Sequence, residues 1–215
     1  MADQTFSDRR DAGRQLGERL LELKPQSPVV YALPRGGVPV GFEVAKALRC
    51  PLDMLIVRKL GVPHQPELAM GALAEDGVVV RNSDVIAGAM LDEDDFAVVV
   101  EYEASVLAEK VKTLRAGHEP VSPIGHTAIV VDDGLATGST ALAAVSVLRQ
   151  KGAESVWLAV PVAPATSMGS VERAVDETVV LSRPAHFFAV GAWYRDFSQT
   201  DDAEVRELLD RSRLP

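Results

Sequence analysis

Apolar residues follow two patterns that alternate along the chain. Short runs rich in β-branched residues predict buried strands, and apolar residues three or four positions apart predict amphipathic helices. The predicted strands lie near 28–33, 52–58, 78–81, 129–131, 155–162 and 176–182. The predicted helices begin at Ser7 and then cover about 38–49, 92–116, 139–151 and 165–175. This alternation predicts an α/β fold, Rossmann-like, with a mostly parallel sheet flanked by helices.

Length and charge narrow the class of protein. The chain has 215 residues, enough for a single α/β domain over residues 1–215. Its net charge of −9 argues against nucleic-acid binding, which needs clustered Lys and Arg. Cys50 is the single cysteine, and there is neither a signal peptide nor a long apolar run. We therefore expect a cytoplasmic protein with no internal disulfide and no membrane association.

The most informative segment is 129–140, Ile-Val-Val-Asp-Asp-Gly-Leu-Ala-Thr-Gly-Ser-Thr. Asp132 and Asp133 follow a buried strand, at the edge where parallel sheets bind ligands. Ala136, Thr137, Gly138, Ser139 and Thr140 then lead into a helix. The first amides of that helix and the hydroxyl groups favour a phosphate. A Walker A loop is excluded because no lysine lies between Gly134 and Thr140.

At these residues the sequence resembles the type I phosphoribosyltransferases, and within them an uncharacterised bacterial group. The resemblance implies that Asp132 and Asp133 hold the ribose hydroxyls of phosphoribosyl pyrophosphate (PRPP). It also implies that residues 136–140 bind the 5-phosphate. Some family members that use 6-oxopurines carry Asp where this chain has Ala136, so such a substrate is disfavoured.

A second glycine turn follows the strand at 28–33. Arg35, Gly36 and Gly37 precede a predicted helix, which makes another anion cradle with a fixed guanidinium group. In the family, the loop at this place binds the pyrophosphate, often through a non-proline cis peptide. An ordinary strand-to-helix turn with a surface arginine is the alternative.

Arg58 and Lys59 are expected at the carboxyl end of the strand at 52–58. Two cations there suit a pyrophosphate leaving group, with Arg58 binding it and Lys59 counted among the catalytic residues. Two solvated surface charges are the alternative. Residues 60–77 contain many residues that break regular structure, and the family places a mobile loop there that closes over PRPP.

The resemblance divides the domain into a core of about residues 7–182 and a small C-terminal hood of about 183–215. A hood of this kind selects the acceptor in the family. Trp193 and Tyr194 can stack on a planar acceptor, or they can pin the C-terminal helix onto the core. The sequence leaves both possibilities open.

The hypothesis is a Mg²⁺-dependent transfer of the 5-phosphoribosyl group from PRPP to a small planar nitrogen acceptor, a nucleobase. Mg²⁺ is expected to be held mainly by PRPP, with Asp132 and Asp133 as further ligands. No residue is identified as the general base. The alternatives are a non-catalytic PRPP or nucleotide sensor and a hydrolase, and a homodimer is expected by resemblance only.

Overall fold

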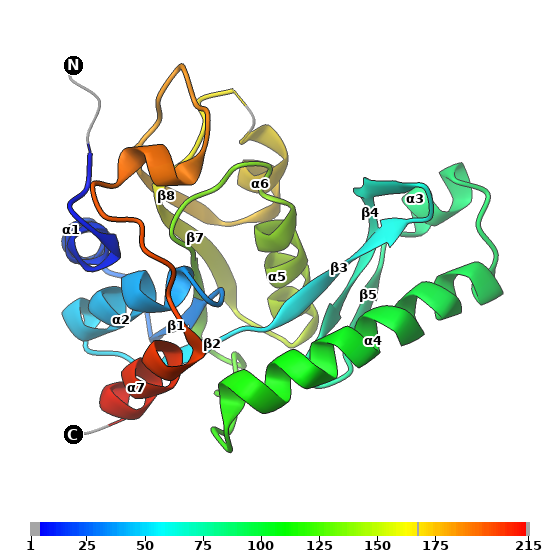
Figure 1. Ribbon diagram of the computed structural model, residues 1–215, viewed down its shortest axis with the longest axis horizontal. Coiled ribbons are helices and arrows are strands. Elements are labelled where there is room, and N and C mark those ends of the chain that lie inside the picture. The colour runs from blue at the N-terminus through cyan, green and yellow to red at the C-terminus, as the bar shows by residue number, and fades with distance from the viewer. Residues whose placement is uncertain (1–4, 167, 214–215) are drawn as a thin grey trace.

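The computed structural model describes residues 5–166 and 168–213, and its centre is a five-stranded parallel sheet (Figure 1). The strand order is β2-β1-β6-β7-β8, and every neighbouring pair is parallel. These strands are β1 (Pro28–Ala32), β2 (Leu52–Met54), β6 (Thr127–Val131), β7 (Ser155–Val162) and β8 (Glu177–Ser182). The predicted α/β class with a mostly parallel sheet is therefore confirmed.

Helices cover both faces of this sheet because its strands are apolar on both sides. Val30 of β1 and Ile129 of β6 face one core, and the alternating residues Val29 and Val130 face the other. The first core is closed by α1 (Arg9–Leu23), α2 (Gly37–Leu48) and α7 (Asp202–Ser212). The second is closed by α5 (Ser139–Gln150) and α6 (Gly169–Ala174). The two layers are visible on either side of the sheet in Figure 1.

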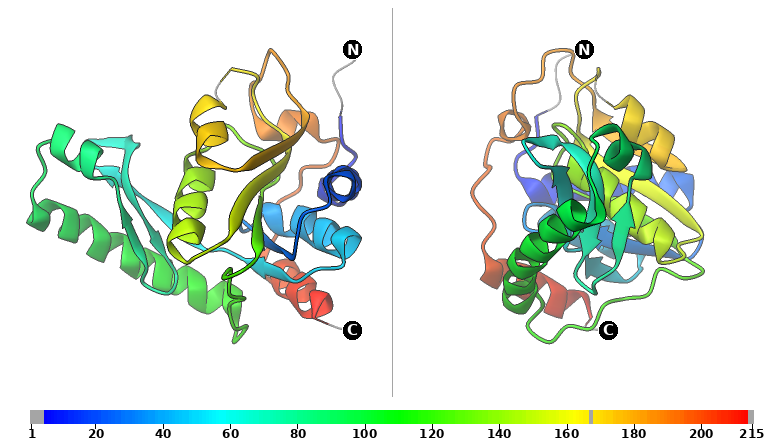
Figure 2. Two further views of the ribbon diagram at one scale, coloured as in Figure 1. Left: turned by 180° about the vertical axis from the view of Figure 1, so that it is seen from behind. Right: turned by 90° about the vertical axis from the view of Figure 1, so that its right-hand side faces the viewer.

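A second, antiparallel sheet forms an arm that extends from the parallel sheet (Figures 1 and 2). The arm consists of β3 (Val57–Val62), β4 (Gln65–Ala74), β5 (Val79–Arg81), α3 (Ser83–Gly88) and α4 (Glu93–Arg115). The prediction of one strand over 52–58 is wrong, because the chain leaves the parallel sheet after Met54. The prediction of an irregular loop over 60–77 is also wrong, because strands fill most of it. Movement of this segment stays a prediction.

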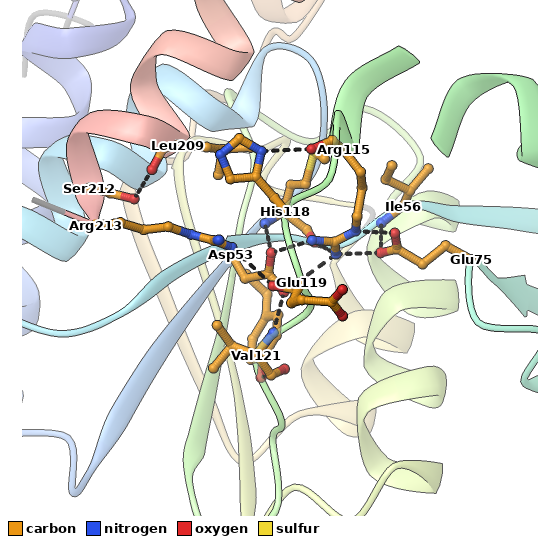
Figure 3. A network of polar contacts seen from close by, with 12 residues as sticks. Asp53, Ile56, Glu75, Arg115, His118, Glu119, Val121, Leu209, Ser212 and Arg213 are labelled. Atoms are coloured by element: carbon orange, nitrogen blue, oxygen red, sulfur yellow. Dashed lines mark hydrogen bonds and ion pairs between the residues drawn. The ribbon is translucent and has the colours of Figure 1, made fainter. Parts of the chain in front are cut away.

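One buried arginine joins the arm to the parallel sheet (Figure 3). Arg115, at the end of α4, donates to Asp53 of β2, to the carbonyl oxygen of Met54 and to Glu75, which follows β4. Burial alone would lower the pKa of Arg115, but the carboxylates of Glu75 and Asp53 outweigh it and raise this pKa. The side chains of all three charged residues are less than 10% exposed.

The C-terminal segment returns across the molecule to meet the N-terminal segment. The short 3₁₀ helix η1 (Val190–Trp193) is followed by backbone hydrogen bonds that pair Phe6 with Trp193 and Arg195. Phe6, Trp193 and Tyr194 form a small apolar cluster with Ala12 of α1. None of the helices in the described residues combines the length and the apolarity needed to cross a bilayer.

Candidate functional site

Asp132 and Asp133 lie directly after β6, at the carboxyl edge of the parallel sheet. The backbone N–H of Asp133 donates to Asp132 Oδ1 at 2.8 Å, so the two residues form one compact turn. Burial raises the pKa of Asp132 well above its usual value, and the neighbouring charge of Asp133 raises it further. Burial also raises the pKa of Asp133, although hydrogen bonding and attraction from Arg9 oppose the increase. Two desolvated carboxyl groups at this edge form a site that favours a hydroxyl-rich or cationic ligand.

Arg9, from the first turn of α1, neutralises one member of this acid pair. Its Nε lies 2.8 Å from Asp133 Oδ2, and the two side chains are only 11% and 15% exposed. The same guanidinium group lies 3.9 Å above the centre of the Phe197 ring and donates from Nη1 to the carbonyl oxygen of Ser198. Three segments that are far apart in sequence therefore fix the orientation of Asp133.

The loop at 136–140 forms the turn expected for a phosphate site. Gly138 adopts φ 73°, a left-handed conformation that favours glycine, and it caps α5 at its N-terminus. The hydroxyl groups of Thr137 and Ser139 lie 3.2 Å apart on this turn. The free amides of the first turn of α5, which form the positive end of the helix dipole, face the same side of the turn as these hydroxyl groups. The binding role of residues 136–140 remains a prediction, for which this geometry is suited.

A cavity of about 880 Å³ adjoins that loop. It lies between α5 and the arm, and Thr137, Ser139 and Leu142 line one wall while Ala72 and Val80 line the opposite one. Its volume is within the range typical of small-molecule sites. The hydroxyl groups of the loop therefore open onto space that a ligand can enter.

The loop at 34–37 packs tightly against the acid pair. The peptide bond between Pro34 and Arg35 is cis, as the resemblance implied. A Cβ atom on Gly36 would lie 2.0 Å from Asp133 Oδ2, and one on Gly37 would lie 2.6 Å from the carbonyl oxygen of Val131. Both glycines are therefore required by space rather than by an unusual φ. Arg35 forms an ion pair with Asp202 of α7, with 2.7 Å between Nε and Oδ1.

Arg58 and Lys59 do not lie at the end of a parallel strand, and that part of the prediction is wrong. They are consecutive residues of β3 in the arm, so their side chains point to opposite faces of its sheet. Arg58 pairs with Glu103 of α4 at 2.6 Å, and Lys59 pairs with Glu67 of β4 at 3.2 Å. The two cations therefore do not face the same point. The catalytic role of Lys59 stays a prediction.

Lys110 of α4 is a neighbour of the site that the sequence did not single out. Its Nζ lies 3.5 Å from the carbonyl oxygen of Pro34, in the loop beside the acid pair. Burial lowers the pKa of Lys110, and the positive charges of Arg58 and Arg35 lower it further. The sequence gives one signal for this position. Lys110 lies seven residues after Glu103, the partner of Arg58, and this spacing places Lys110 and Glu103 on the same face of a helix.

Arg9 was also missed, although a weak signal exists for it. It precedes Ala12 by three residues and therefore continues the apolar stripe of α1 that Ala12 and Leu16 define. A cation in line with a buried stripe must find a partner, and here the partner is 124 residues further along the chain.

The structure buries both aromatic residues that were candidates for acceptor binding. Trp193 is 8% exposed and Tyr194 is 6% exposed. Tyr194 packs against Phe6 and Phe197, with ring centres 5.5 and 5.0 Å away, and its hydroxyl donates to the carbonyl oxygen of Asp133. The two rings therefore pack against the N-terminal segment and the residues after β6, and they do not hold the C-terminal helix α7, whose buried residues lie in the first core. Acceptor binding by either ring stays a prediction, and it requires these rings to become accessible.

Known proteins resemble this chain in both sequence and structure. Residues 9–192 match the family that carries the phosphoribosyl transferase domain. Two proteins of Mycobacterium tuberculosis, from strains CDC 1551 / Oshkosh and ATCC 25618 / H37Rv, are each 51% identical over 207 residues, or 96% of this chain. Their names, phosphoribosyl transferase MT0597 and Rv0571c, are provisional. The chain spans about half the length of these curated relatives, 47% in each case.

A solved structure repeats nearly the whole fold. The crystal structure of TT1426 from Thermus thermophilus is 38% identical in sequence and superimposes with a TM-score of 0.91. The match covers 96% of this chain and 98% of that one. The fold of this chain, from the parallel sheet to the arm, is therefore shared with that protein.

Proposed function

The chain belongs to the phosphoribosyl transferase family, and on that premise we propose that it moves the 5-phosphoribosyl group of PRPP to a nitrogen acceptor, releasing pyrophosphate. The acceptor we propose is a small planar nucleobase. The observation that carries the proposal is the position of Asp132 and Asp133, which lie between the Gly36–Gly37 turn and the N-terminus of α5. A sugar with an anionic group at each end fits between two such anion-binding turns.

Each part of the site has a role in this proposal. The amides and hydroxyl groups of residues 136–140 bind the 5-phosphate, and Asp132 and Asp133 accept hydrogen bonds from the ribose hydroxyls. Arg35, Gly36, Gly37 and Arg58 bind the pyrophosphate. As the bond from sugar carbon to pyrophosphate breaks, the nearby carboxylates stabilise the positive charge on the sugar. Positioning of the two substrates and exclusion of water supply the remainder of the rate acceleration.

Mg²⁺ fits this site as an ion carried by the substrate. Within the described residues no cluster of three or more His, Cys, Asp or Glu side chains is arranged to hold a metal ion. Mg²⁺ commonly uses one or two carboxylates together with phosphate oxygens, and Asp132 and Asp133 are the carboxylates available here. When bound, the ion would neutralise charge on the pyrophosphate group. Arg9 already engages Asp133, so Asp132 is the residue more available to it.

We further propose that residues 1–215 act as one domain with its core at about 7–182 and its hood at about 183–215. The backbone pairing of Phe6 with the residues around Trp193 supports this, because it connects the two ends of the chain. Assembly as a homodimer and a cytoplasmic location remain expectations from the resemblance and from the cysteine content.

The proposal is tested by measuring pyrophosphate release from PRPP with Mg²⁺, using a panel of nucleobases and a control without base. Release that depends on one base supports the transferase and identifies its acceptor. Release without any base indicates hydrolysis instead. Tight binding of PRPP without release, measured by calorimetry, indicates the sensor and refutes the enzymatic proposal.

A further inference from the structure

Lys110 has no counter-ion in the described part of the chain. Its ammonium group contacts only the carbonyl oxygen of Pro34, at 3.5 Å, and no described carboxylate forms an ion pair with it. Its side chain is nevertheless partly buried, and burial lowers its pKa. Lysine is rarely buried without a partner, because the charged form loses its hydration. An ammonium group in this position therefore indicates a place where an anion binds.

The other cations around Lys110 are already neutralised. Arg35 pairs with Asp202 at 2.7 Å, and Arg58 pairs with Glu103 at 2.6 Å. Both guanidinium groups lower the pKa of Lys110, whereas the carboxylates of Asp132 and Asp202, neither of which forms an ion pair with it, raise this pKa. Three cations from β3, α4 and the 34–37 loop thus surround one region at the edge of the ribose site. Two of them carry an acidic partner, and among the described residues Lys110 has none.

The position of Lys110 is fixed by its helix. Glu103 and Lys110 are seven residues apart on α4, which is about two turns, so they share one face. Five residues after Lys110, the buried network of Arg115 attaches the end of α4 to the parallel sheet. Lys110 therefore lies on a fixed element rather than on a loop that must close. Lys59, by contrast, lies on the other face of β3 and pairs with Glu67.

We propose that Lys110 binds the diphosphate group of the substrate and that, with Arg35 and Arg58, it makes a preformed diphosphate site on the inner end of the arm. This inference rests on the proposed function and adds to it a residue outside the predicted motifs. A diphosphate supplies the counter-ion that Lys110 lacks among the described residues. Its further oxygens compete with Asp202 and Glu103 for the two guanidinium groups, which donate to phosphate in a bidentate manner.

The test compares Lys110→Met with Lys112→Met, an exposed lysine two residues further along the same helix. Binding of Mg²⁺-pyrophosphate, of PRPP with Mg²⁺ and of ribose 5-phosphate is measured by calorimetry for each variant. We expect Lys110→Met to weaken pyrophosphate and PRPP about tenfold or more and to leave ribose 5-phosphate within about twofold. Lys112→Met should change none of the three. Lys110→Arg should recover most of the loss.

Each outcome separates this inference from the proposed function. If the Lys110→Met variant binds pyrophosphate as tightly as the wild-type protein, or loses ribose 5-phosphate equally, the inference is wrong while the proposed function stands. If the wild-type protein binds neither PRPP nor pyrophosphate, both are wrong. Circular dichroism melting curves of the Met and Arg variants establish whether each is folded, and within the described residues the substitution by Met removes one hydrogen bond, that to Pro34.

Discussion

Arg9 and Asp133 form an ion pair, 2.8 Å from Nε to Oδ2, between the first turn of the first helix and the acid pair that follows β6. Most of both side chains is shielded from solvent, so the attraction is screened less than in a surface pair. The stacking of the same guanidinium group on Phe197 adds a third segment to the contact. The N-terminal helix is thereby part of the site and not only part of its support.

We expect Arg9→Met to reduce kcat/KM for PRPP by about 10- to 100-fold, because Asp133 loses the group that orients it. It should also lower the free energy of unfolding by about 1–3 kcal/mol, since a shielded carboxylate is left without its partner. Denaturant unfolding and initial rates measure the two effects. Arg14→Met is the control, because Arg14 lies on the exposed face of the same helix. Full activity in Arg9→Met would show that Asp133 needs no orientation by Arg9.

Asp132→Asn should slow transfer strongly and stabilise the fold. The pKa of Asp132 is raised in the folded protein, chiefly by burial and then by the charge of Asp133. Folding therefore favours the protonated form, and ionisation destabilises the fold. This cost is absent below the ordinary aspartate pKa of about 3.8. It grows as the pH rises from there through the raised pKa of Asp132. Asn carries no charge, so the free energy of unfolding of the variant should not fall with pH for this reason.

The measurement is the free energy of unfolding of both proteins between about pH 4 and 8, with pyrophosphate release followed at about pH 7.5. The advantage of Asp132→Asn over the wild-type protein should increase with pH, while its rate falls by at least about 100-fold. The same gap in stability at every pH would contradict the assigned protonation behaviour. The double variant Asp132→Asn/Asp133→Asn should be folded and inactive, and normal turnover in it would refute the ribose assignment.

Gly36→Ala and Gly37→Ala should fail in different ways. A Cβ on Gly36 meets the Asp133 carboxylate, which can swing away from Arg9, so activity should fall by about 100-fold with a modest loss of stability. A Cβ on Gly37 meets backbone atoms of Val131 and Asp132, which cannot move without disturbing β6. Its main effect should be a loss of about 2 kcal/mol or more in the free energy of unfolding.

Steady-state rates and denaturant unfolding of both glycine variants provide the comparison. Gly88→Ala is the control, because a Cβ there has open space around it. Equal stability losses in the two variants of the 34–37 loop would argue against a selective displacement of Asp133.

Arg115→Met should destabilise the protein by about 3–5 kcal/mol, because it leaves Asp53 and Glu75 buried without their cation. Arg149→Met, which removes an exposed ion pair with Asp176 and two exposed hydrogen bonds to the carbonyl oxygen of Ala174, should cost no more than about 1–2 kcal/mol. Urea unfolding at about pH 7 measures both. A loss for Arg115→Met as small as that for Arg149→Met would mean that the joint between the two sheets contributes little. Hydrogen exchange at β3 and β4 would then be expected to match the wild-type protein.

Local patterns predicted the parallel core well, since each strand and its following helix carry their own signals. The strand at 155–162 matches β7, and the acid pair lies directly after β6 as expected. The break after Met54 could not be predicted because Leu52 to Val57 is almost uniformly apolar. Its position is determined by long-range bonds, from Leu55 N to Ala32 O and from Glu75 N to Ile56 O. These partners have no signature in the local sequence.

Residues of the candidate site were predicted only where they lie in or next to a recognisable sequence motif. Asp132, Asp133 and residues 136–140 share one segment, so strand, acids and helix start were read together. Arg9 and Lys110 lie on two other helices, and the patterns within those helices give only weak signals of a role in the site. Their burial is decided by tertiary packing, which brings α1 against the acid pair and α4 against the 34–37 loop.

The absence of side chains at Gly36 and Gly37 has a consequence for how this protein can vary. The start of α2 meets the end of β6 there through main-chain and carboxylate atoms, and at Gly37 no neighbouring side chain can move to make room. In a library that samples all amino acids at every position and is selected for activity, these two sites should accept glycine alone, whereas the exposed positions of the arm should tolerate exchange. Divergence within this group of proteins is therefore expected to proceed around a fixed pair of positions.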